Sequence, residues 1–164
     1  MGTGKSSAGR MIAELLGFDF LDTDEEIERL SKKSIASIFA EDGEARFRKY
    51  ECDLVAELAN RRKTVISTGG GLGANTENLK QLKTHSLVVC LWATPEKIWE
   101  RVRHQGHRPL LKEADPMAKI RQLLATREPC YKQADALLNT DSRSLREVVQ
   151  QVLHQYHLAR THHT

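Results

Sequence analysis

The sequence has no long apolar run, few aromatic residues and little net charge, and each shortage excludes a class of protein. No apolar stretch approaches the roughly 20 residues that a membrane-spanning helix needs, so we expect no membrane anchor. Aromatic residues make up 5% of the chain, and the net charge is only +3, with acids interspersed among the bases. Nucleic-acid binding is therefore not expected, because it needs basic patches and stacking aromatics.

Cysteine is also scarce. Cys52, Cys90 and Cys130 are odd in number, far apart and not in CxxC spacing. This pattern argues against a disulfide framework or a zinc site, and it indicates reduced thiols in a cytoplasmic protein. We also expect no secretory signal. The length of 164 residues, 40% of them hydrophobic, predicts one globular domain with one core.

What the sequence does contain is an alternation of strand and helix patterns. Short apolar or β-branched segments predict strands at 18–21, 64–68, 86–92 and 136–140. Helical patterns follow the opening glycines and recur at 25–30, 34–39, 43–60, 94–104, 116–134 and 144–157, with Cys52 on the buried stripe of the third of these. The alternation predicts an α/β fold, a three-layer α/β/α sandwich around a parallel sheet, whose ligands bind at the carboxyl ends of the strands.

The opening residues MGTGKSS match the second half of the phosphate-binding loop GxxxxGK[ST]. In that pattern Lys5 contacts the β- and γ-phosphates, Ser6 ligates Mg²⁺, and the loop amides form an anion-binding nest at a helix N-terminus. A glycine-rich helix start is the alternative interpretation. The first glycine of the loop would lie two residues before Met1, outside this sequence.

Two aspartates, Asp22 and Asp24, follow the strand predicted at 18–21. Residues two apart on an extended segment face the same way. One of these carboxylates is a candidate for the magnesium shell and the other for a substrate hydroxyl. Capping of the next helix by Thr23 or Asp24 is an equally good explanation.

Three consecutive glycines, Gly69, Gly70 and Gly71, end the strand predicted at 64–68. Glycines there cost chain entropy, so they suggest a close approach of a ligand to the backbone.

Arginines supply the remaining candidates. Arg48 and Glu51 share a helical face, for which a surface ion pair is the simplest interpretation. Arg127 becomes important if it converges with Arg48, because two arginines suit a carboxylate. Arg108 lies in the polar segment 104–115, which we interpret as a mobile loop able to close over ATP.

Taken in order, the segments MGTGKSS, FLDTDEEIE, SIASIF, GEARFRKYE, STGGG, RPLL and REPCY resemble shikimate kinase over nearly the whole chain. The resemblance implies a nucleoside-monophosphate-kinase-like P-loop sandwich with a five-stranded parallel sheet. It also implies transfer of the γ-phosphate of ATP to the 3-hydroxyl of shikimate, in aromatic amino-acid biosynthesis. A single domain spanning 1–164, with a lid at about 104–115 and a shikimate-binding region at about 24–60, is expected, as is a cytoplasmic monomer.

The resemblance also implies roles for individual residues. Lys5, Asp24 and Arg108 would be catalytic, and Mg²⁺ would be held by Ser6 and Asp22. The residues implied for ATP are Gly2, Thr3, Gly4, Lys5, Ser6, Ser7, Arg101, Arg108 and Arg143. Those implied for shikimate are Asp24, Arg48, Gly69, Gly70, Gly71 and Arg127, with Glu51 orienting Arg48.

One departure from the family pattern has a structural consequence. The family has a central strand ahead of the loop, and this sequence begins inside the loop. We therefore expect a gap in the sheet, costing more than the ~5–15 kcal/mol by which a typical domain is stable. A misplaced internal start at Met1 is our hypothesis, and a truncation or another filler of the gap are alternatives. The alternative functions are another small-molecule kinase, such as a gluconate kinase, or an inactive kinase-derived binding module.

Overall fold

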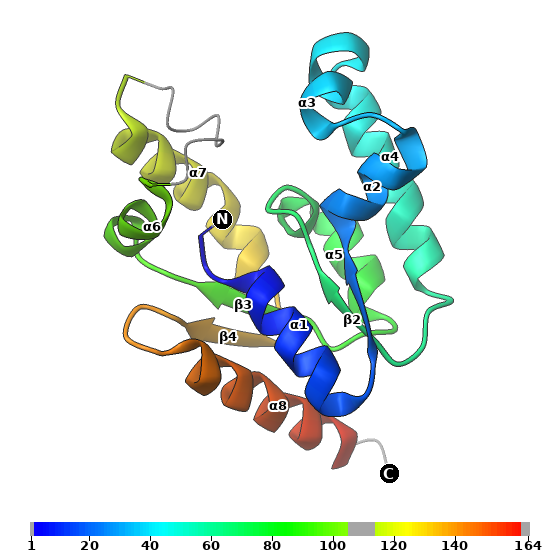
Figure 1. The fold of residues 1–164 in the computed structure, drawn as a ribbon, viewed down its shortest axis with the longest axis vertical. Coiled ribbons are helices and arrows are strands. Elements are labelled where there is room, and N and C mark those ends of the chain that lie inside the picture. Colours follow the sequence, from blue (N-terminus) through cyan, green and yellow to red (C-terminus); the bar gives the residue numbers. More distant parts are fainter. Residues whose placement is uncertain (1, 105–113, 162–164) are drawn as a thin grey trace.

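In the part of the chain that the structure describes, four short strands and the helices that cover them make up the fold (Figure 1). The computed structural model describes residues 2–104 and 114–161. In chain order its elements are α1 (Lys5–Leu16), β1 (Asp19–Asp22), α2 (Thr23–Ser31), α3 (Ile35–Ser37), the π-helix η1 (Ile38–Asp42), α4 (Glu44–Leu58), β2 (Thr64–Ser67), the 3₁₀-helix η2 (Leu72–Ala74), α5 (Thr76–Lys83), β3 (Val89–Trp92), α6 (Pro95–Val102), α7 (Pro116–Tyr131), β4 (Ala136–Asn139) and α8 (Leu145–Thr161). The alternation predicted from the sequence is confirmed, with shifted bounds. No helix in the described ranges is long and apolar enough to cross a membrane.

The turn from β1 into α2 corrects one expectation. Asp22, and neither Thr23 nor Asp24, caps α2: its Oδ1 accepts a hydrogen bond from the Asp24 N–H at 3.0 Å. Asp24 therefore lies in the first helical turn and not on an extended segment, so the two-residue spacing does not explain how the two carboxylates come together. Acidic side chains in a first turn also interact favourably with the helix dipole.

Helix α4 corrects a second expectation. Phe47, Leu54 and Val55 are buried as predicted, but Cys52 is exposed. The position that completes the buried face is Glu51, which is 1% exposed. A carboxylate in such a place needs a partner, so the predicted surface ion pair with Arg48 is instead half-buried.

The strands form two separate parallel pairs. β1 pairs with β2 in the register Asp19↔Thr64, and β3 pairs with β4 in the register Val89↔Ala136. No backbone hydrogen bond within the described ranges joins β2 to β3. In Figure 1 the two pairs lie on either side of α1.

The same helices nevertheless cover both pairs, which confirms the three-layer arrangement. Val65 of β2 and Leu91 of β3 pack against one cluster built from α1 and α8. On the opposite face, Ile66 of β2 and Val88, next to β3, pack against a cluster from α2, α4 and α5. Neighbouring residues of β2 thus face opposite layers, as the alternation of a strand requires.

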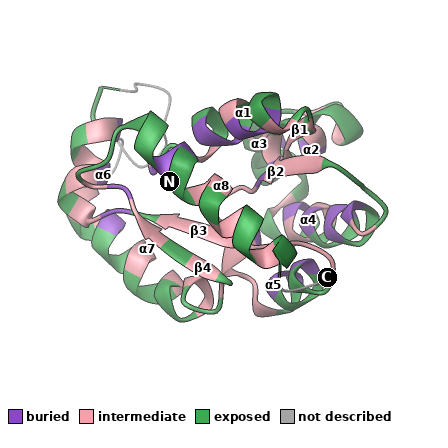
Figure 2. Ribbon diagram, turned by 90° about the horizontal axis from the view of Figure 1, so that it is seen from below, coloured by how far each residue is buried: buried purple, intermediate pink, exposed green. Residues whose placement is uncertain are grey.

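The gap expected in the sheet is therefore present between β2 and β3. Strands covered on both faces are normally buried, whereas Figure 2 shows these strands mainly at intermediate exposure. Trp92, at the end of β3, is 42% exposed. An apolar cavity of about 90 Å³ is lined by the whole of β3 and by Leu79, Leu123 and Leu124.

We predict that a strand joined to the amino end of this chain stabilises the fold. The extension Val-Ile-Leu-Val-Gly-Ala before Met1 should pair with β2 and β3 and bury its side chains, each worth about 1.5–3 kcal/mol. The melting temperature, followed by circular dichroism, should rise by about 10 °C or more. A control extension, Val-Pro-Leu-Asp-Gly-Ala, cannot complete the ladder. Equal melting temperatures for the two extended chains would contradict the prediction.

Candidate active site

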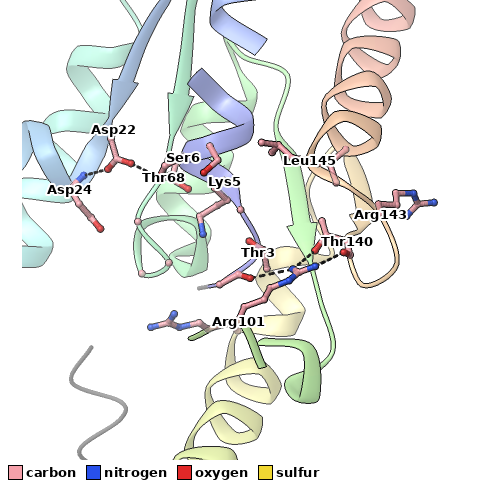
Figure 3. Close-up of a pocket in the computed structure, with 18 residues that line it drawn as sticks. Thr3, Lys5, Ser6, Asp22, Asp24, Thr68, Arg101, Thr140, Arg143 and Leu145 are labelled. Atoms are coloured by element: carbon pink, nitrogen blue, oxygen red, sulfur yellow. Dashed lines mark hydrogen bonds between the residues drawn. The ribbon is translucent and has the colours of Figure 1, made fainter. Parts of the chain in front are cut away.

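A loop of positive-φ glycines begins the site. Gly2 and Gly4 have φ values of 62° and 84°, and Gly4 caps α1 in the left-handed conformation. Only glycine adopts this region without strain, and successive turns of this kind direct N–H groups toward one point. That point lies at the N-terminus of a 12-residue helix, which favours an anion. Lys5 lines the same cavity (Figure 3).

The cavity at this loop has a volume of about 710 Å³ and collects most of the residues singled out from the sequence. Those that line it are Gly2, Thr3, Gly4, Lys5, Ser6, Ser7, Asp22, Asp24, Gly69, Gly70, Gly71, Arg101, Arg127 and Arg143. Arg48 lies against Gly71 at its border. Arg108 and most of the lid expected at 104–115 lie outside the described residues.

A cluster of oxygens lies where α1, β1 and β2 meet. The Ser6 hydroxyl donates to Oδ2 of Asp22 at 2.8 Å and lies 3.2 Å from the hydroxyl of Ser67. Magnesium is usually bound in proteins by one or two carboxylates together with phosphate oxygens and water. The donor set beside the phosphate loop fits that chemistry. No group of three His, Cys, Asp or Glu side chains able to hold a metal occurs in residues 2–104 and 114–161.

The three glycines after β2 each make room for one charged side chain. A Cβ on Gly69 would overlap the Asp24 carboxylate, and one on Gly71 would overlap the Arg48 guanidinium. A Cβ on Gly70 would lie 2.9 Å from Nη1 of Arg127. Side chains of the protein therefore approach this backbone closely, and they account for the glycines without the ligand that the sequence suggested. Any side chain in this turn would displace the acid or one of the arginines.

Arg48 is held by two carboxylates. Its Nη1 donates to Glu51 at 2.8 Å and its Nη2 donates to Glu44 at 2.8 Å. The Glu51 side chain is 2% exposed and that of Arg48 is 36% exposed. Burial raises the pKa of Glu51, while the hydrogen bond and charge of Arg48 oppose the rise. Arg48 and Arg127 both lie against this turn. The two arginines therefore converge, which is the condition under which the sequence made Arg127 a candidate.

Asp24 is the acid of the site, and its surroundings oppose its ionisation. Burial raises the pKa of its carboxyl, the charges of Asp22 and Glu51 raise it further, and Lys5 acts in the opposite direction. A carboxyl with a raised pKa is a stronger proton acceptor when ionised. The arrangement can therefore bind phosphates at one end, hold a carboxylate at the other and accept a proton between them.

Arg101 also lines the cavity, beside the phosphate loop. The guanidinium of Arg101 donates to the Gly2 carbonyl at 3.2 Å, to the Thr140 hydroxyl at 2.9 Å and to the Thr140 carbonyl at 2.5 Å (Figure 3). Arg143 donates to the carbonyl of Asn139. Arg101 thus ties the phosphate loop to the segment after β4.

Comparison with known proteins agrees with this geometry. The family model for shikimate kinase matches residues 1–157. The chain belongs to the shikimate kinase family. A shikimate kinase from Pelotomaculum thermopropionicum is 44% identical over 154 residues, which cover 94% of this chain and 90% of the relative. One from Thermodesulfovibrio yellowstonii is 39% identical over 156 residues, covering 95% and 90%.

Solved structures give the same result. The shikimate kinase from Acinetobacter baumannii in complex with shikimate matches with a TM-score of 0.88 and 38% identity, over 98% of this chain and 89% of that one. A gluconokinase from Sinorhizobium meliloti 1021 matches with a TM-score of 0.61 and 22% identity, over 98% and 88%. The second likeness shows the fold alone, so the alternative of a gluconate kinase has no support beyond the fold.

Several residues around this cavity were not predicted from the sequence. Thr23, which is fully buried, accepts the N–H of Gly69 at 2.9 Å, and Tyr131 donates to the carbonyl of Gly70 at 2.9 Å. Ser67, Thr68, Thr140, Leu145 and Val148 complete the set. A buried threonine between two candidate aspartates, and a tyrosine one turn after Arg127, were the available signals.

We predict that Asp24→Asn stabilises the fold at neutral pH. The folded-state pKa of Asp24 is raised above 3.8, so the stability tied to its protonated form is complete below that pH and is lost as the pH rises through the folded value. No hydrogen bond to its carboxylate is present in the described ranges. The melting temperature of the variant should exceed that of the parent at about pH 7, and the difference should vanish at about pH 3.

Asp53→Asn, on the exposed face of α4, is the control for this prediction and should show no such pH-dependent gain. A lower melting temperature for Asp24→Asn at neutral pH would contradict the prediction.

Proposed function

We propose that this chain transfers the γ-phosphate of ATP to the 3-hydroxyl of shikimate, giving shikimate 3-phosphate and ADP. The observation that carries the proposal is the turn of Gly69, Gly70 and Gly71, against which Asp24, Arg127 and Arg48 lie in turn. It supplies an acid and one guanidinium group, those of Asp24 and Arg127, within a cavity that also contains a phosphate loop, and a second guanidinium group, that of Arg48, at the border of this cavity. A small carboxylated polyol needs that combination.

At the nucleotide end, we assign the phosphates of ATP to Lys5 and to the N–H groups of residues 2–7. Arg101 and Arg143 lie further along the cavity, and we place the adenine on their side, next to Leu145 and Val148. Arg108 and a lid at about 104–115 belong to the proposal through the family resemblance, as the charge that closes over the phosphates.

Ser6 and Asp22 are the residues that would hold Mg²⁺. Their oxygens already lie 2.8 Å apart beside the loop, and Asp22 Oδ1 is occupied by the cap of α2. Asp22 is therefore better suited to an outer-shell role, through water, than to chelation with both oxygens. The ion, when bound, would neutralise charge that develops on the transferring phosphoryl group.

At the substrate end, Arg48 and Arg127 would bind the carboxylate of shikimate, with the N–H groups of Gly70 and Gly71 beside them. Arginine suits this task because its planar guanidinium matches a carboxylate. Glu51 keeps Arg48 in place from the buried side. The shikimate-binding region at about 24–60 and the glycine turn thus meet at one wall of the cavity.

Asp24 would orient the 3-hydroxyl and accept its proton as the oxygen attacks phosphorus. Its raised pKa favours this role, because proton transfer is most effective when the acceptor titrates nearer the working pH. Alignment of the two substrates and neutralisation of charge supply most of the remaining acceleration. The three thiols, of which Cys52 is exposed, support a reducing cytoplasm, and we propose a monomer in solution.

The first test is a coupled ADP-release assay with MgATP and either shikimate or gluconate. The assay compares the 164-residue chain with the same chain carrying the Val-Ile-Leu-Val-Gly-Ala extension. Turnover with shikimate by either protein supports the proposal. Turnover with gluconate alone would favour the other kinase. ATP binding without turnover of either compound would favour a binding module.

We predict that Arg127→Lys raises the KM for shikimate by about 10- to 100-fold, since it removes one charge-assisted pair worth about 1.5–3 kcal/mol. The KM for ATP should change less than twofold. The matched control is Arg121→Lys, which lies on the same helix as Arg127 and alters only an exposed ion pair with Glu96 of α6. Equal rises in the KM for ATP and for shikimate would contradict the assignment.

A further inference from the structure

The glycine turn that carries the proposed substrate wall is flexible by composition. Three glycines in succession have more backbone freedom than any other tripeptide. They are required by the close approach of Asp24, Arg127 and Arg48, so no bulkier residue can stiffen the turn from within. Its order must therefore come from contacts made by other elements.

Two such contacts hold the turn from opposite ends. From α2, the hydroxyl of Thr23 accepts the N–H of Gly69 at 2.9 Å. From the last turn of α7, the hydroxyl of Tyr131 donates to the carbonyl of Gly70 at 2.9 Å. Thr23 is fully buried and Tyr131 is half-buried, so water competes poorly for either bond.

The second contact also orients the donor that follows it. The peptide unit between Gly70 and Gly71 is planar, and no cis peptide occurs in the described ranges. Fixing the Gly70 carbonyl therefore fixes the Gly71 N–H, which points the opposite way. Neither the Gly70 nor the Gly71 N–H has an acceptor within residues 2–104 and 114–161, so both remain available to a ligand.

Tyr131 is well suited to be a permanent donor. Burial raises the pKa of its hydroxyl, and the charge of Arg127, one helical turn away, opposes the rise only in part. The hydroxyl therefore keeps its proton throughout the neutral range. The same helix thus carries both Arg127, which lies against Gly70, and the hydroxyl that holds the Gly70 carbonyl.

We propose that Thr23 and Tyr131 are positioning residues that clamp the glycine turn, and that Tyr131 thereby sets the affinity for the carboxylated substrate. The inference rests on the proposed placement of that carboxylate against Arg48, Arg127 and the turn. Neither residue touches substrate in this scheme. They act by ordering the N–H donors and the groups that lie on the glycines.

The test is Tyr131→Phe, which removes one oxygen and no packing. The KM for shikimate should rise by about fivefold or more, as loss of one hydrogen bond implies. The kcat and the KM for ATP should stay within about twofold, and the melting temperature within about 2 °C. The matched control is Tyr156→Phe on α8, where the ring of Tyr156 packs edge-on against that of Phe18; this variant should change none of these quantities. If Tyr131 had a purely structural role, the variant would have a lower melting temperature, and the KM for shikimate would not rise selectively over kcat and the KM for ATP.

A second variant tests the clamp from its other end. Thr23→Val should raise the KM for shikimate in the same way, and the double variant should be affected less than the product of the single effects, because both act on one turn. If Tyr131→Phe fails to fold, Thr23→Val alone decides. An unchanged KM for shikimate, or a fall in kcat at constant KM, would overturn the clamp. If the unsubstituted enzyme turns over shikimate in the same assay, either of these results rejects the clamp alone and leaves the proposed function intact.

Discussion

The absence of three Cβ atoms is the constraint on which the rest of this site depends. Gly69, Gly70 and Gly71 are contacted by an acid from α2, an arginine from α7 and an arginine from α4. Three helices that are distant in sequence can approach one another at that point only because the backbone between them carries no side chains. The compactness that results brings the charges into one wall of the cavity, and the cost is a backbone that other residues must hold in place.

The same compactness governs the electrostatics. Asp24 and Glu51 are both partly removed from water, and the burial of each raises its pKa. Glu51 has a direct partner in Arg48, whereas Asp24 has only the more distant charge of Lys5 in its favour. Two carboxylates in one region thus have different surroundings: Glu51 is the counter-ion of Arg48, whereas Asp24 has no ion-pair partner among the described residues, which is why we propose it as the proton acceptor. Such division between neighbouring acids is common where a site performs proton transfer.

Local patterns were sufficient to predict the strands, most of the helices, the layers and most of the cavity wall, but α5 (Thr76–Lys83) was not predicted. The phosphate loop and the glycine turn are contiguous in sequence, so their chemistry is visible there. The residues that were missed act at a distance: Thr23 and Tyr131 matter only because α2 and α7 converge on the turn. Glu51 was interpreted as a surface residue because helical spacing reveals a shared face but not which face is buried. The capping role of Asp22 was assigned to its neighbours because α2 begins at Thr23, two residues before the start predicted from the sequence.

The bonds of Arg101 have a thermodynamic consequence. Through them the phosphate loop is attached to the β3–β4 pair, while Ser6 attaches the start of α1 to the ends of β1 and β2. A polyphosphate bound in the loop would therefore lie across the boundary between two half-sheets that share no backbone hydrogen bonds within the described ranges. Its binding free energy adds to the cohesion of the two halves by mass action, about 2.7 kcal/mol at a hundredfold excess over Kd. For this chain, nucleotide is then a structural component as much as a substrate.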